Sequence, residues 1–367
     1  MIQKIWIKGY RNLSEKKLIL EPGQNYFIFG ENNQGKTNFL ESLYLLGNGR
    51  APIEKDLSKI VGLNQPETVV GADYLSKQGS KRIYIKLDTL GKRFISINNE
   101  PIKTIKNIDN DLCIDFISAD ILHIFQNYSD FRRRDLNKFG GKLTPSYNLL
   151  NSKYDKIIKH KNKLLKEKSD KKNILIWTDQ QLELGTQLVN ERLSILSTLE
   201  KKLIEIKEKL DGVIPGSLTL NYKIKGSDAP INLDNERYSN WLESKLKNNI
   251  DKEIYAGMTL YGPHRDDFEI YIDKKPLTSW YSRGINRSFA VLLKYAQLLC
   301  LKDNGNPLPL LCIDDAFAEI DHKVKAKLFD IIQEDIQVFY TSVLESDYTF
   351  IKDGVKLKMT NGCLTDV

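Results

Sequence analysis

The chain has 367 residues, of which 41% are hydrophobic, and a formal net charge of +7. This length allows roughly two to three domains, and this hydrophobic fraction is sufficient for a buried core. The most apolar stretch, at 288–301, is interrupted by Lys294 and Gln297, which argues against a membrane span and for a buried helix. The mildly basic balance permits a polyanionic partner without requiring one.

Neither secretion nor zinc binding is expected. The N-terminal segment alternates apolar and charged side chains and lacks the hydrophobic stretch of a signal peptide, which predicts a cytoplasmic protein. The cysteines have no metal-ligand spacing, and we expect free thiols at Cys113, Cys300, Cys312 and Cys363.

The first third of the chain predicts strands around a glycine-rich loop. Apolar, β-branched and aromatic residues alternate with polar ones within 1–29, and the last of these strands leads directly into GENNQGKTN at 30–38. Apolar residues at helical spacing follow the loop, up to a glycine-rich turn. Residues 68–99 alternate again with turn residues between them, which predicts an antiparallel sheet, and 111–117 predicts one more strand.

The stretch GENNQGKTN matches G-x-x-x-x-G-K-[ST], the pattern of a loop that wraps nucleotide phosphates. In such a loop, the backbone N–H groups of residues 31–37 would surround the β-phosphate, assisted by the N-terminus of the next helix. Lys36 would reach the β- and γ-phosphates, and the Thr37 hydroxyl would bind Mg²⁺. The alternative is an incidental glycine turn, which the flanking strand and helix argue against.

Helical patterns replace the strand signals from about residue 145 to residue 210. Leucine or valine recurs every seven residues from Leu182 to Leu210, which predicts a long helix with an apolar seam. An earlier apolar helix would fold back on it through SDKKNILIW at 169–177. Residues 153–172 hold nine lysines and three acids, a net charge of +6. Two interpretations stay open: a solvated helix face, or a basic arm lying along a phosphate backbone.

After residue 257, short strands alternate with helices, which predicts a largely parallel sheet covered on both faces. One apolar strand, within PLPLLCIDD, ends in Asp314 and Asp315. A P-loop site needs an acid at the end of a neighbouring strand, so Asp314 is the candidate metal ligand, and Asp315 is the candidate to orient or deprotonate the attacking water. The two ends of the chain thus predict one α/β domain with a helical insertion.

A third motif lies just before the acidic strand. In YSRGINRSFAVLLKYAQ, at 281–297, Ser282 and Gly284 open a long helix. This arrangement resembles the signature motif of ABC-type ATPases, in which the serine hydroxyl, the glycine backbone and the helix N-terminus cap the γ-phosphate held by the other subunit. A simple helix cap at Ser282 is the alternative.

The chain as a whole resembles the RecF family of bacterial recombination-repair ATPases, which are related to SMC-type proteins. The matching stretches run in order along nearly the whole chain: GYRNL, GENNQGKTNFLESLYLLGNGR, DFRRRDLN, IWTDQQLELG, YGPHRDDFEI, SRG and IDDAFAEID. The resemblance implies an α/β fold in which an ABC-type P-loop ATPase head, with a mixed and largely parallel sheet and an antiparallel β subdomain, carries an inserted α-helical arm domain. The expected bounds are 1–125 and 258–367 for the head and 126–257 for the arm.

The resemblance also implies a function. We expect a weak, DNA-dependent ATPase that uses ATP and Mg²⁺ and forms a homodimer when ATP binds. It would bind gapped DNA or junctions between single-stranded and double-stranded DNA and act with RecR and RecO in recombinational repair. Recombinase loading, replication restart and the SOS response would depend on it, and it would be nucleoid-associated in the cytoplasm, with no membrane partner.

Site residues follow from the resemblance by position. The loop residues expected to bind ATP are Gly30, Glu31, Asn32, Asn33, Gln34, Gly35, Lys36, Thr37 and Asn38, with Arg11 and Asn12 beside them, and the residues expected at the partner's ATP are Ser282, Arg283 and Gly284. The metal would bind Thr37 and Asp314, hydrolysis would use Asp314 and Asp315, and Asp321 would lie at the dimer interface. The candidates for DNA contact are Arg50, Arg132, Arg133, Arg134, Lys153, Lys156 and Lys163.

Several of these assignments keep an alternative. Arg11 and Asn12 are equally compatible with a polar strand end, and Arg50 with an exposed helix end. The arginines at 132–134 fit contacts with DNA or with the adjacent arm. Thr341 and Ser342 take the place where transporters of the wider class carry a histidine that senses the γ-phosphate, and the turn with His264 and Arg265 receives no chemical role.

Two departures from the family pattern bear on function. The signature usually continues with glutamine, whereas this chain has Ile285, whose side chain has no hydrogen-bond donor. Loss of a contact worth about 0.5–1.5 kcal/mol from each composite site would weaken ATP-driven dimerisation and reduce ATPase activity. After GNGR the family commonly adds arginines, and APIEKDL supplies none.

Two other classes of function are alternatives. A P-loop kinase of small molecules would share the loop and the acids, but it has no need of a basic helical hairpin or of the SRG helix start. A DNA-binding scaffold that uses ATP only for assembly, with little or no hydrolysis, would share all of these motifs.

Overall fold

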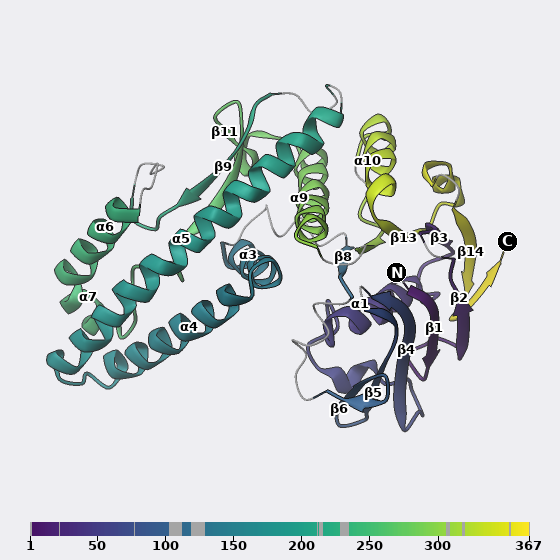
Figure 1. The fold of residues 1–367 in the computed structure, drawn as a ribbon, viewed down its shortest axis with the longest axis horizontal. Coiled ribbons are helices and arrows are strands. Elements are labelled where there is room, and N and C mark those ends of the chain that lie inside the picture. The colour runs from purple at the N-terminus through teal and green to yellow at the C-terminus, as the bar shows by residue number, and fades with distance from the viewer. Residues whose placement is uncertain are drawn as a thin grey trace. The chain divides into compact units, whose positions relative to one another are not determined.

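The computed structural model describes residues 2–21, 23–76, 78–102, 112–118, 129–210, 212, 216–227, 235–305, 309–317, 320–351 and 354–366. The chain divides into two compact units, whose elements are labelled in Figure 1. Unit 1 is Met1–Leu122, Ile206–Ile214 and Arg283–Val367, and unit 2 is His123–Glu205 and Pro215–Ser282. The two ends of the chain, together with Ile206–Ile214, therefore build one unit, and the rest of the middle of the chain builds the other.

One sheet of unit 1 has six strands in the order β15-β14-β3-β13-β12-β8. These strands are β3 (Tyr26–Phe29), β8 (Ile114–Ser118), β12 (Leu310–Asp314), β13 (Gln337–Ser342), β14 (Val355–Thr360) and β15 (Cys363–Asp366). All pairings are parallel except that of β15 with β14. The inner strands β3, β12 and β13 are almost fully buried, as expected when both faces of a sheet are covered. The predicted largely parallel sheet is confirmed.

Helices cover both faces of this sheet. The helix α1 (Lys36–Asn48) buries Leu40 and Leu43 in one core that includes Ile5 from the second sheet and Phe339 from β13. Figure 1 shows α9 (Arg283–Asp303) and α10 (His322–Asp335) on the other side of the parallel sheet. Since α1 is packed between two sheets, the start of this helix is held firmly at the end of β3.

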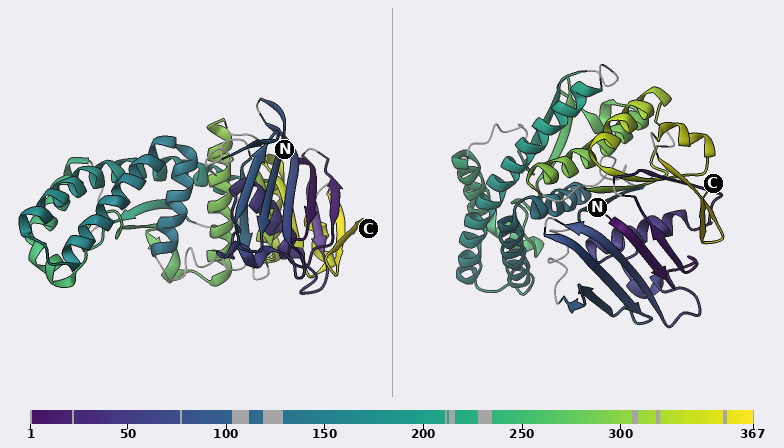
Figure 2. Two further views of the ribbon diagram at one scale, coloured as in Figure 1. Left: turned by 90° about the horizontal axis from the view of Figure 1, so that it is seen from below. Right: turned by 45° about the vertical axis from the view of Figure 1, so that its right-hand side comes forward.

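The second sheet of unit 1 is antiparallel, in the order β2-β1-β4-β5-β6-β7. Its strands are β1 (Ile2–Lys8), β2 (Lys16–Ile19), β4 (Glu67–Ser76), β5 (Gly79–Asp88), β6 (Arg93–Ile97) and β7 (Glu100–Pro101). The right view of Figure 2 shows these strands side by side in purple and blue. Burial alternates along β5, which agrees with the alternation that predicted this sheet. Among the described residues, unit 1 also has two short 3₁₀ helices, η1 (Leu57–Ile60) and η4 (Glu345–Phe350).

Unit 2 is built on two long helices, α4 (Pro145–Lys166) and α5 (Lys171–Lys209), and the last four residues of α5 belong to unit 1. Two contacts show that these helices lie side by side and antiparallel. Lys161 donates a hydrogen bond to Gln181 near the end of α4, and Arg192 donates one to the Tyr147 hydroxyl near its start. The seven-residue seam is buried along most of α5, from Val189 onwards, which confirms the predicted apolar stripe.

The connection between these helices is shorter than predicted. Residues 171–177 are helical, so the turn is confined to 167–170. The buried side chain of Ile174 forms a small core with Leu165 and Ile250, and this packing draws the segment into the helix.

The other elements that the structure describes in unit 2 are α3 (Ser129–Leu143), α6 (Asn235–Asn248), α7 (Ile250–Ala256), α8 (Leu277–Trp280), β9 (Leu218–Lys223), β10 (Asp267–Ile272) and β11 (Lys275–Pro276). β10 pairs antiparallel with β9 along its whole length. Residues 258–282 therefore belong to unit 2, whereas the bounds expected from the sequence put them in the head, and unit 1 resumes at Arg283. Among the residues described, no helix is both long and apolar enough to span a bilayer.

Candidate functional site

The glycine-rich loop connects β3 to α1. Gly30 has φ +156°, and a Cβ there would lie 2.4 Å from the carbonyl oxygen of Met359. Gly35 precedes α1 with φ +108°, a left-handed conformation that glycine adopts without a Cβ penalty. Both glycines of the motif are thus required by the path of the backbone from the strand to the helix.

Lys36 folds back over this loop. Its Nζ donates to the carbonyl oxygens of Gly30 at 2.6 Å and Glu31 at 2.7 Å, and the residue is 8% exposed. Burial lowers the pKa of Lys36, and Asp314 and Asp315 oppose this shift. The ammonium is therefore held beside the loop by hydrogen bonds that phosphate oxygens are able to replace.

A cavity of about 770 Å³ opens beside the loop, a volume typical of a small-molecule site. Its lining comes from the loop, the start of α1, the strand ends of the parallel sheet, the turn after β1 and the segment after α1: Asn12, Asn32, Asn33, Gly35, Lys36, Thr37, Asn38, Ile53, Ser118, Asp314, Asp315 and Val343. The structure thus brings most of the predicted ATP-binding residues and both predicted acids together. Of the other predicted residues near the loop, Gly30, Glu31, Gln34 and Arg11 lie outside this lining.

Asp314 ends β12 at the edge of the sheet where the glycine loop lies, because the carboxyl ends of parallel strands share one edge. The Thr37 hydroxyl donates to Oδ2 of Asp314 at 2.8 Å, and the Thr341 hydroxyl donates to Oδ1 at 2.7 Å. Burial raises the pKa of Asp314, and the two hydroxyls and Lys36 oppose this shift. Asp315 follows with φ +48° and is exposed.

The donor set suits magnesium. Mg²⁺ binds oxygen ligands and keeps several water or phosphate oxygens, so it needs few protein side chains. Thr37 and Asp314 present a hydroxyl and a carboxylate oxygen within 2.8 Å of each other in the cavity lining. No group of three or more His, Cys, Asp or Glu side chains able to hold a metal occurs in the described ranges.

Asn12 lines the cavity, and Arg11, just before it, contacts the start of α1. The amide of Asn38 donates to Oδ1 of Asn12 at 2.7 Å, and the amide of Asn12 donates to the carbonyl oxygen of Asn33 at 3.3 Å. Nη1 of Arg11 donates to Oδ1 of Asn38 at 2.9 Å. The turn after β1 is therefore tied to the glycine loop and to α1, which places both predicted residues beside the site.

Sequence reasoning missed Glu41, a fully buried acid in α1. Its Oε2 lies 2.9 Å from Nη1 of Arg11. Neither Glu41 oxygen receives a well-oriented hydrogen bond from a described residue, and the same is true of the Tyr10 hydroxyl. Burial raises the pKa of Glu41 to about 7, opposed by Arg11 and reinforced by Asp314. The available signal was one acid inside the apolar stretch FLESLYLL.

Replacing Glu41 with glutamine is expected to flatten the pH dependence of stability. A carboxyl whose pKa rises on folding from 4.5 to about 7 stabilises the folded state below the lower value, and this contribution is lost as the pH rises through 7. Glutamine does not titrate. Unfolding temperatures measured without nucleotide at about pH 6 and about pH 8 test this. Glu15→Gln, at an exposed acid, is the control, and equal slopes in all three proteins would contradict the prediction.

The predicted signature residues lie at the start of α9. Ser282 and Arg283 are exposed, and the Ser288 hydroxyl donates to the carbonyl oxygen of Gly284 at 2.9 Å. Within the part of the chain described, none of the residues at 282–284 lines the cavity beside the glycine loop. A role at the nucleotide of a second copy stays a prediction.

Asp321 has a local role as the N-cap of α10. Its Oδ1 accepts hydrogen bonds from the backbone N–H groups of Lys323 at 2.9 Å and Val324 at 3.4 Å. The residue is exposed, so the cap leaves it accessible to a partner.

The three candidate arginines at 132–134 have different surroundings. Arg132 is 7% exposed and binds Asp267 through Nε at 2.9 Å and Nη2 at 2.6 Å. Arg133 donates to the carbonyl oxygen of Asp266 at 2.7 Å, and Arg134 is exposed. For Arg132 the buried bidentate pair favours the second of the two alternatives, a contact within the protein, because a guanidinium paired with a carboxylate is not available to phosphates.

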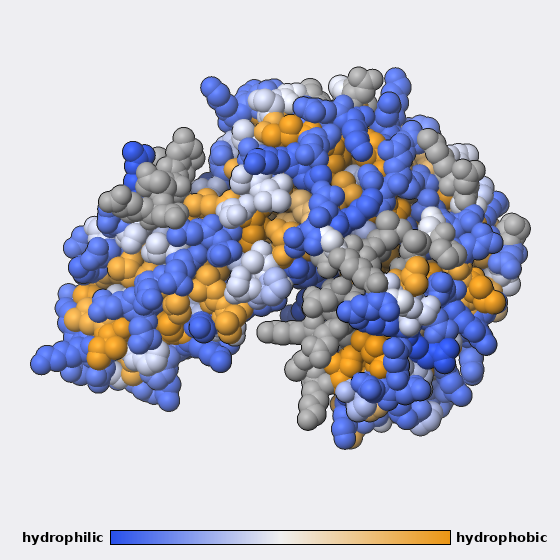
Figure 3. Space-filling view, in the orientation of Figure 1, coloured by the Kyte–Doolittle hydropathy of each residue, from blue (hydrophilic) through white to orange (hydrophobic). Residues whose placement is uncertain are grey.

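The candidate lysines on α4 are exposed, as is Arg50 in unit 1. These lysines are Lys153, Lys156 and Lys163. Lys161, in the same basic run, is fully buried and lies 2.8 Å from Glu253, so it does not contribute to a basic surface. Figure 3 shows hydrophilic residues along the helices of unit 2 with hydrophobic patches between them.

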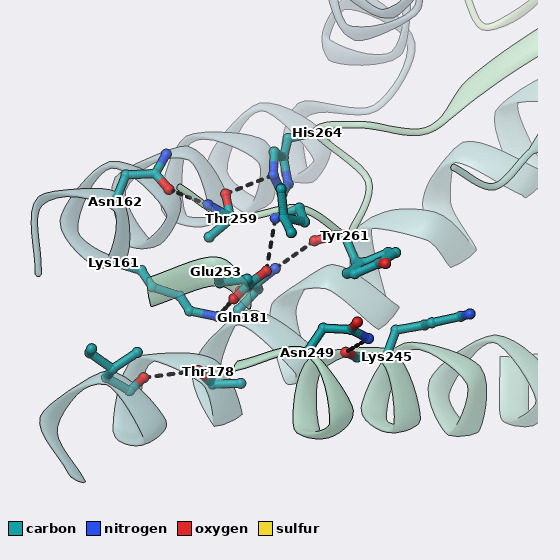
Figure 4. A network of polar contacts seen from close by, with 12 residues as sticks. Lys161, Asn162, Thr178, Gln181, Lys245, Asn249, Glu253, Thr259, Tyr261 and His264 are labelled. Atoms are coloured by element: carbon teal, nitrogen blue, oxygen red, sulfur yellow. Dashed lines mark hydrogen bonds and ion pairs between the residues drawn. The ribbon is translucent and has the colours of Figure 1, made fainter. Parts of the chain in front are cut away.

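The turn that contains His264 is part of a buried polar network in unit 2, drawn in Figure 4. The Tyr154 hydroxyl lies 2.8 Å from Nδ1 of His264, and the Thr259 hydroxyl lies 2.9 Å from Nε2. Burial lowers the pKa of His264 to about 3, so its ring is neutral near pH 7. Arg265 donates to the carbonyl oxygen of Thr259 at 3.1 Å. The structure thus gives this turn a packing role that the sequence did not assign.

A glycine loop between β3 and α1, an acid at the end of β12 and a cavity beside them form a P-loop nucleotide site. The fold that carries this site is that of an ABC-type ATPase head. The fold is similar to that of a recombination mediator protein RecF solved with ATP, with a TM-score of 0.84, 23% identity, and coverage of 100% of this chain and 97% of that one. It is also similar to an Smc head bound to the C-winged helix domain of ScpA, with a TM-score of 0.59, 14% identity, and coverage of 100% and 96%.

Sequence similarity gives the family. The chain is 32% identical to the DNA replication and repair protein RecF of Halothermothrix orenii, over 99% of this chain and 98% of that protein. It is 31% identical to the RecF of Acetivibrio thermocellus, over 93% and 92%. No protein-family model matches the chain. The chain belongs to the RecF family of DNA replication and repair proteins.

Proposed function

We propose that this protein is an ATP-dependent DNA-binding protein of recombinational repair. ATP binding drives two copies to dimerise on gapped or junction DNA, and slow, DNA-dependent hydrolysis resets the dimer. This cycle supports recombinase loading, replication restart and the SOS response at the nucleoid. The observation that carries the proposal is the contact of Thr37 with Asp314 in the cavity beside the glycine loop. Membership of the RecF family supports the repair function.

ATP is the nucleotide that we assign to the cavity. Lys36 exchanges its loop carbonyls for the β- and γ-phosphates, and the backbone N–H groups of 31–37 hold the phosphates at the start of α1. Thr37 and Asp314 hold Mg²⁺, which neutralises phosphate charge when bound. Asp315, exposed beside Asp314, orients the attacking water. The similar RecF solved with ATP supports this choice of nucleotide.

A second copy completes the site in this proposal. The signature residues at 282–284 cap the γ-phosphate of the partner's ATP, and the exposed Asp321 lies at the dimer interface. The exposure of Ser282 and Arg283 outside the lining of the cavity supports this arrangement. The similar RecF acts in the RecFOR pathway, which supports RecO and RecR as further partners.

The DNA-binding surface that we assign lies on α3 and α4 of unit 2. Its exposed cations are Arg134, Lys153, Lys156 and Lys163. Arg50, exposed in unit 1, is a separate candidate for DNA contact. Each cation that neutralises a phosphate releases counterions, so the logarithm of the affinity should fall steeply with the logarithm of the salt concentration.

Lys36→Ala tests the proposed function. Alanine does not reach the phosphates, and the loss of charged hydrogen bonds is expected to lower ATP affinity by about 10- to 100-fold. ATP-driven dimerisation and ATP-dependent binding to gapped DNA should be lost with it. Light scattering gives the mass in solution with and without ATP, and titration of gapped DNA gives the affinity. Lys59→Ala, at an exposed lysine, is the control. If Lys36→Ala dimerises with ATP as the native protein does, ATP binding at this loop does not drive dimerisation.

Ile285 favours a second function, a DNA-binding scaffold with little or no hydrolysis. Ile285→Gln restores a hydrogen-bond donor worth about 0.5–1.5 kcal/mol, so turnover should rise by about 2- to 10-fold. The measurement is ATP turnover at saturating gapped DNA, with Ile285→Leu as the control. Equal rates would remove Ile285 as the cause of weak activity, and no turnover in any of the proteins would favour the scaffold.

A further inference from the structure

A buried polar cluster lies behind one wall of the nucleotide cavity in unit 1. Oδ2 of Asp347, in η4, accepts hydrogen bonds from the Ser342 hydroxyl at 2.6 Å and the Tyr340 hydroxyl at 2.9 Å. Nζ of Lys325 lies 2.9 Å from Oδ1 of Asp347, and the side chains of this pair are 9% and 14% exposed. The ion pair is therefore largely removed from water.

Ser342 connects the cluster to the cavity. It is the last residue of β13, and its hydroxyl also accepts a hydrogen bond from the backbone N–H of Leu344 at 3.1 Å. The residue before it, Thr341, donates to Asp314, and the residue after it, Val343, lines the cavity. The segment held by the cluster thus runs from the proposed metal ligand to the cavity wall.

Lys325 connects the same cluster to the start of α10. Its backbone N–H donates to the carbonyl oxygen of Asp321 at 2.8 Å, in the first turn of the helix that Asp321 caps. Its ammonium lies 4.5 Å from the ring centroid of Phe350 and 5.6 Å from that of Tyr340. The side chain is therefore fixed on several sides.

A buried ion pair gains little stability, because desolvation offsets the attraction, and apolar residues of similar volume often stabilise a fold as well. A second cluster of the same chemistry lies at the far end of α10. There Asp335 accepts a hydrogen bond from Tyr295 at 2.9 Å and pairs with Lys302 at 2.9 Å. No hydrogen bond or ion pair described for the Asp335 cluster reaches a residue that lines the cavity. This cluster is therefore a control for the Asp347 cluster, which is connected to the cavity.

We propose that Asp347 is a positioning residue of the ATPase site. Through Ser342 it holds the segment beside Asp314, and through Lys325 it ties this segment to the start of α10. The inference rests on the proposed function, because hydrolysis of ATP by a dimer is the activity that this connection serves. When a second copy docks at Asp321, a displacement of the start of α10 then reaches Asp314, the proposed metal ligand, through Lys325 and Asp347.

Asp347→Asn and Asp335→Asn, each made in the full chain, test this proposal. Both replace one carboxylate oxygen in a cluster of lysine, tyrosine and aspartate. The side chains of Lys302 and Asp335 are 34% and 27% exposed, so we expect a smaller loss of thermal stability from Asp335→Asn. With saturating gapped DNA, Asp347→Asn should lower ATP turnover at least about tenfold while ATP affinity stays within about threefold, because a small misplacement of catalytic groups is costly. Asp335→Asn should leave both quantities close to native. Equal turnover in the two variants would overturn the proposal.

A second variant and a second measurement distinguish a failure of this proposal from a failure of the proposed function on which it rests. Ser342→Ala keeps the pair of Lys325 with Asp347 and should lower turnover in the same direction. ATP should slow hydrogen exchange of a peptide covering 341–350 in the native protein and in Asp335→Asn, but not in Asp347→Asn. Absence of turnover in the native protein would count against the proposed function, whereas ATP-dependent protection retained in Asp347→Asn would overturn the positioning role.

Discussion

Replacing Lys161 with methionine is expected to lower the free energy of unfolding of unit 2 by about 3–5 kcal/mol. Lys161 is fully buried, and its Nζ lies 2.8 Å from Oε2 of Glu253 and 2.8 Å from Oε1 of Gln181. Methionine fills similar space but leaves the Glu253 carboxylate buried without its ammonium. Oε1 of Glu253 keeps a hydrogen bond from the N–H of Leu260 at 2.8 Å, which does not neutralise the charge. Denaturant unfolding followed by circular dichroism measures the loss.

Two further variants control this prediction. Lys163→Met changes an exposed lysine whose Nζ lies 3.9 Å from a Glu167 oxygen, and it should change the stability by less than about 1 kcal/mol. Combining Lys161→Met with Glu253→Gln removes the unpaired charge and should recover part of the loss. A loss in Lys161→Met no larger than that in Lys163→Met would mean that the buried pair does not stabilise unit 2.

Asp314→Asn is expected to lower ATP turnover by roughly 100-fold or more, because stabilisation of transition-state charge by a bound metal is worth several kcal/mol. The carboxylate of Asp314 accepts hydrogen bonds from both Thr37 and Thr341. Asparagine is neutral and turns an NH₂ group toward one of these hydroxyls, so both the metal site and the fixed geometry are weakened. Steady-state hydrolysis with Mg²⁺ and gapped DNA measures the effect.

Nucleotide binding separates the role of Asp314 from that of the phosphate loop. Lys36 and the loop are intact in Asp314→Asn, so ATP affinity without Mg²⁺ should change by less than about threefold. Asp335→Asn makes the same substitution far from the cavity and should hydrolyse ATP like the native protein. Turnover of Asp314→Asn within tenfold of the native rate would argue against Asp314 as the metal ligand.

The core of the candidate site could be predicted because its signals are local. The path of the backbone from β3 into α1 requires Gly30 and Gly35, and this requirement is visible in the motif itself. Asp314 follows an apolar run that can only be a buried strand or helix. The strand order β3-β13-β12, which brings this acid to Thr37, came only from the structure, because no local pattern encodes the pairing of distant parallel strands.

In unit 2 the repeated spacing predicted the buried seam of α5, since positions seven residues apart share one helix face. It did not predict that 171–177 is helical, because Ile174 gains its place by packing on Ile250, far along the chain. It also did not place β10 in this unit, since pairing with β9 decides that assignment.

The sequence by itself determined the family, the phosphate loop, the acid pair and the apolar seam, because each depends on residues that are neighbours along the chain. Only the tertiary structure showed which lysines and arginines are buried in ion pairs and which are exposed. Arg132 pairs with Asp267, which is 135 positions away, and Lys161 with Glu253, which is 92 positions away, whereas Lys163 is exposed. Burial and pairing of a charge depend on which distant partner the fold brings to it, and local spacing carries no information about that partner.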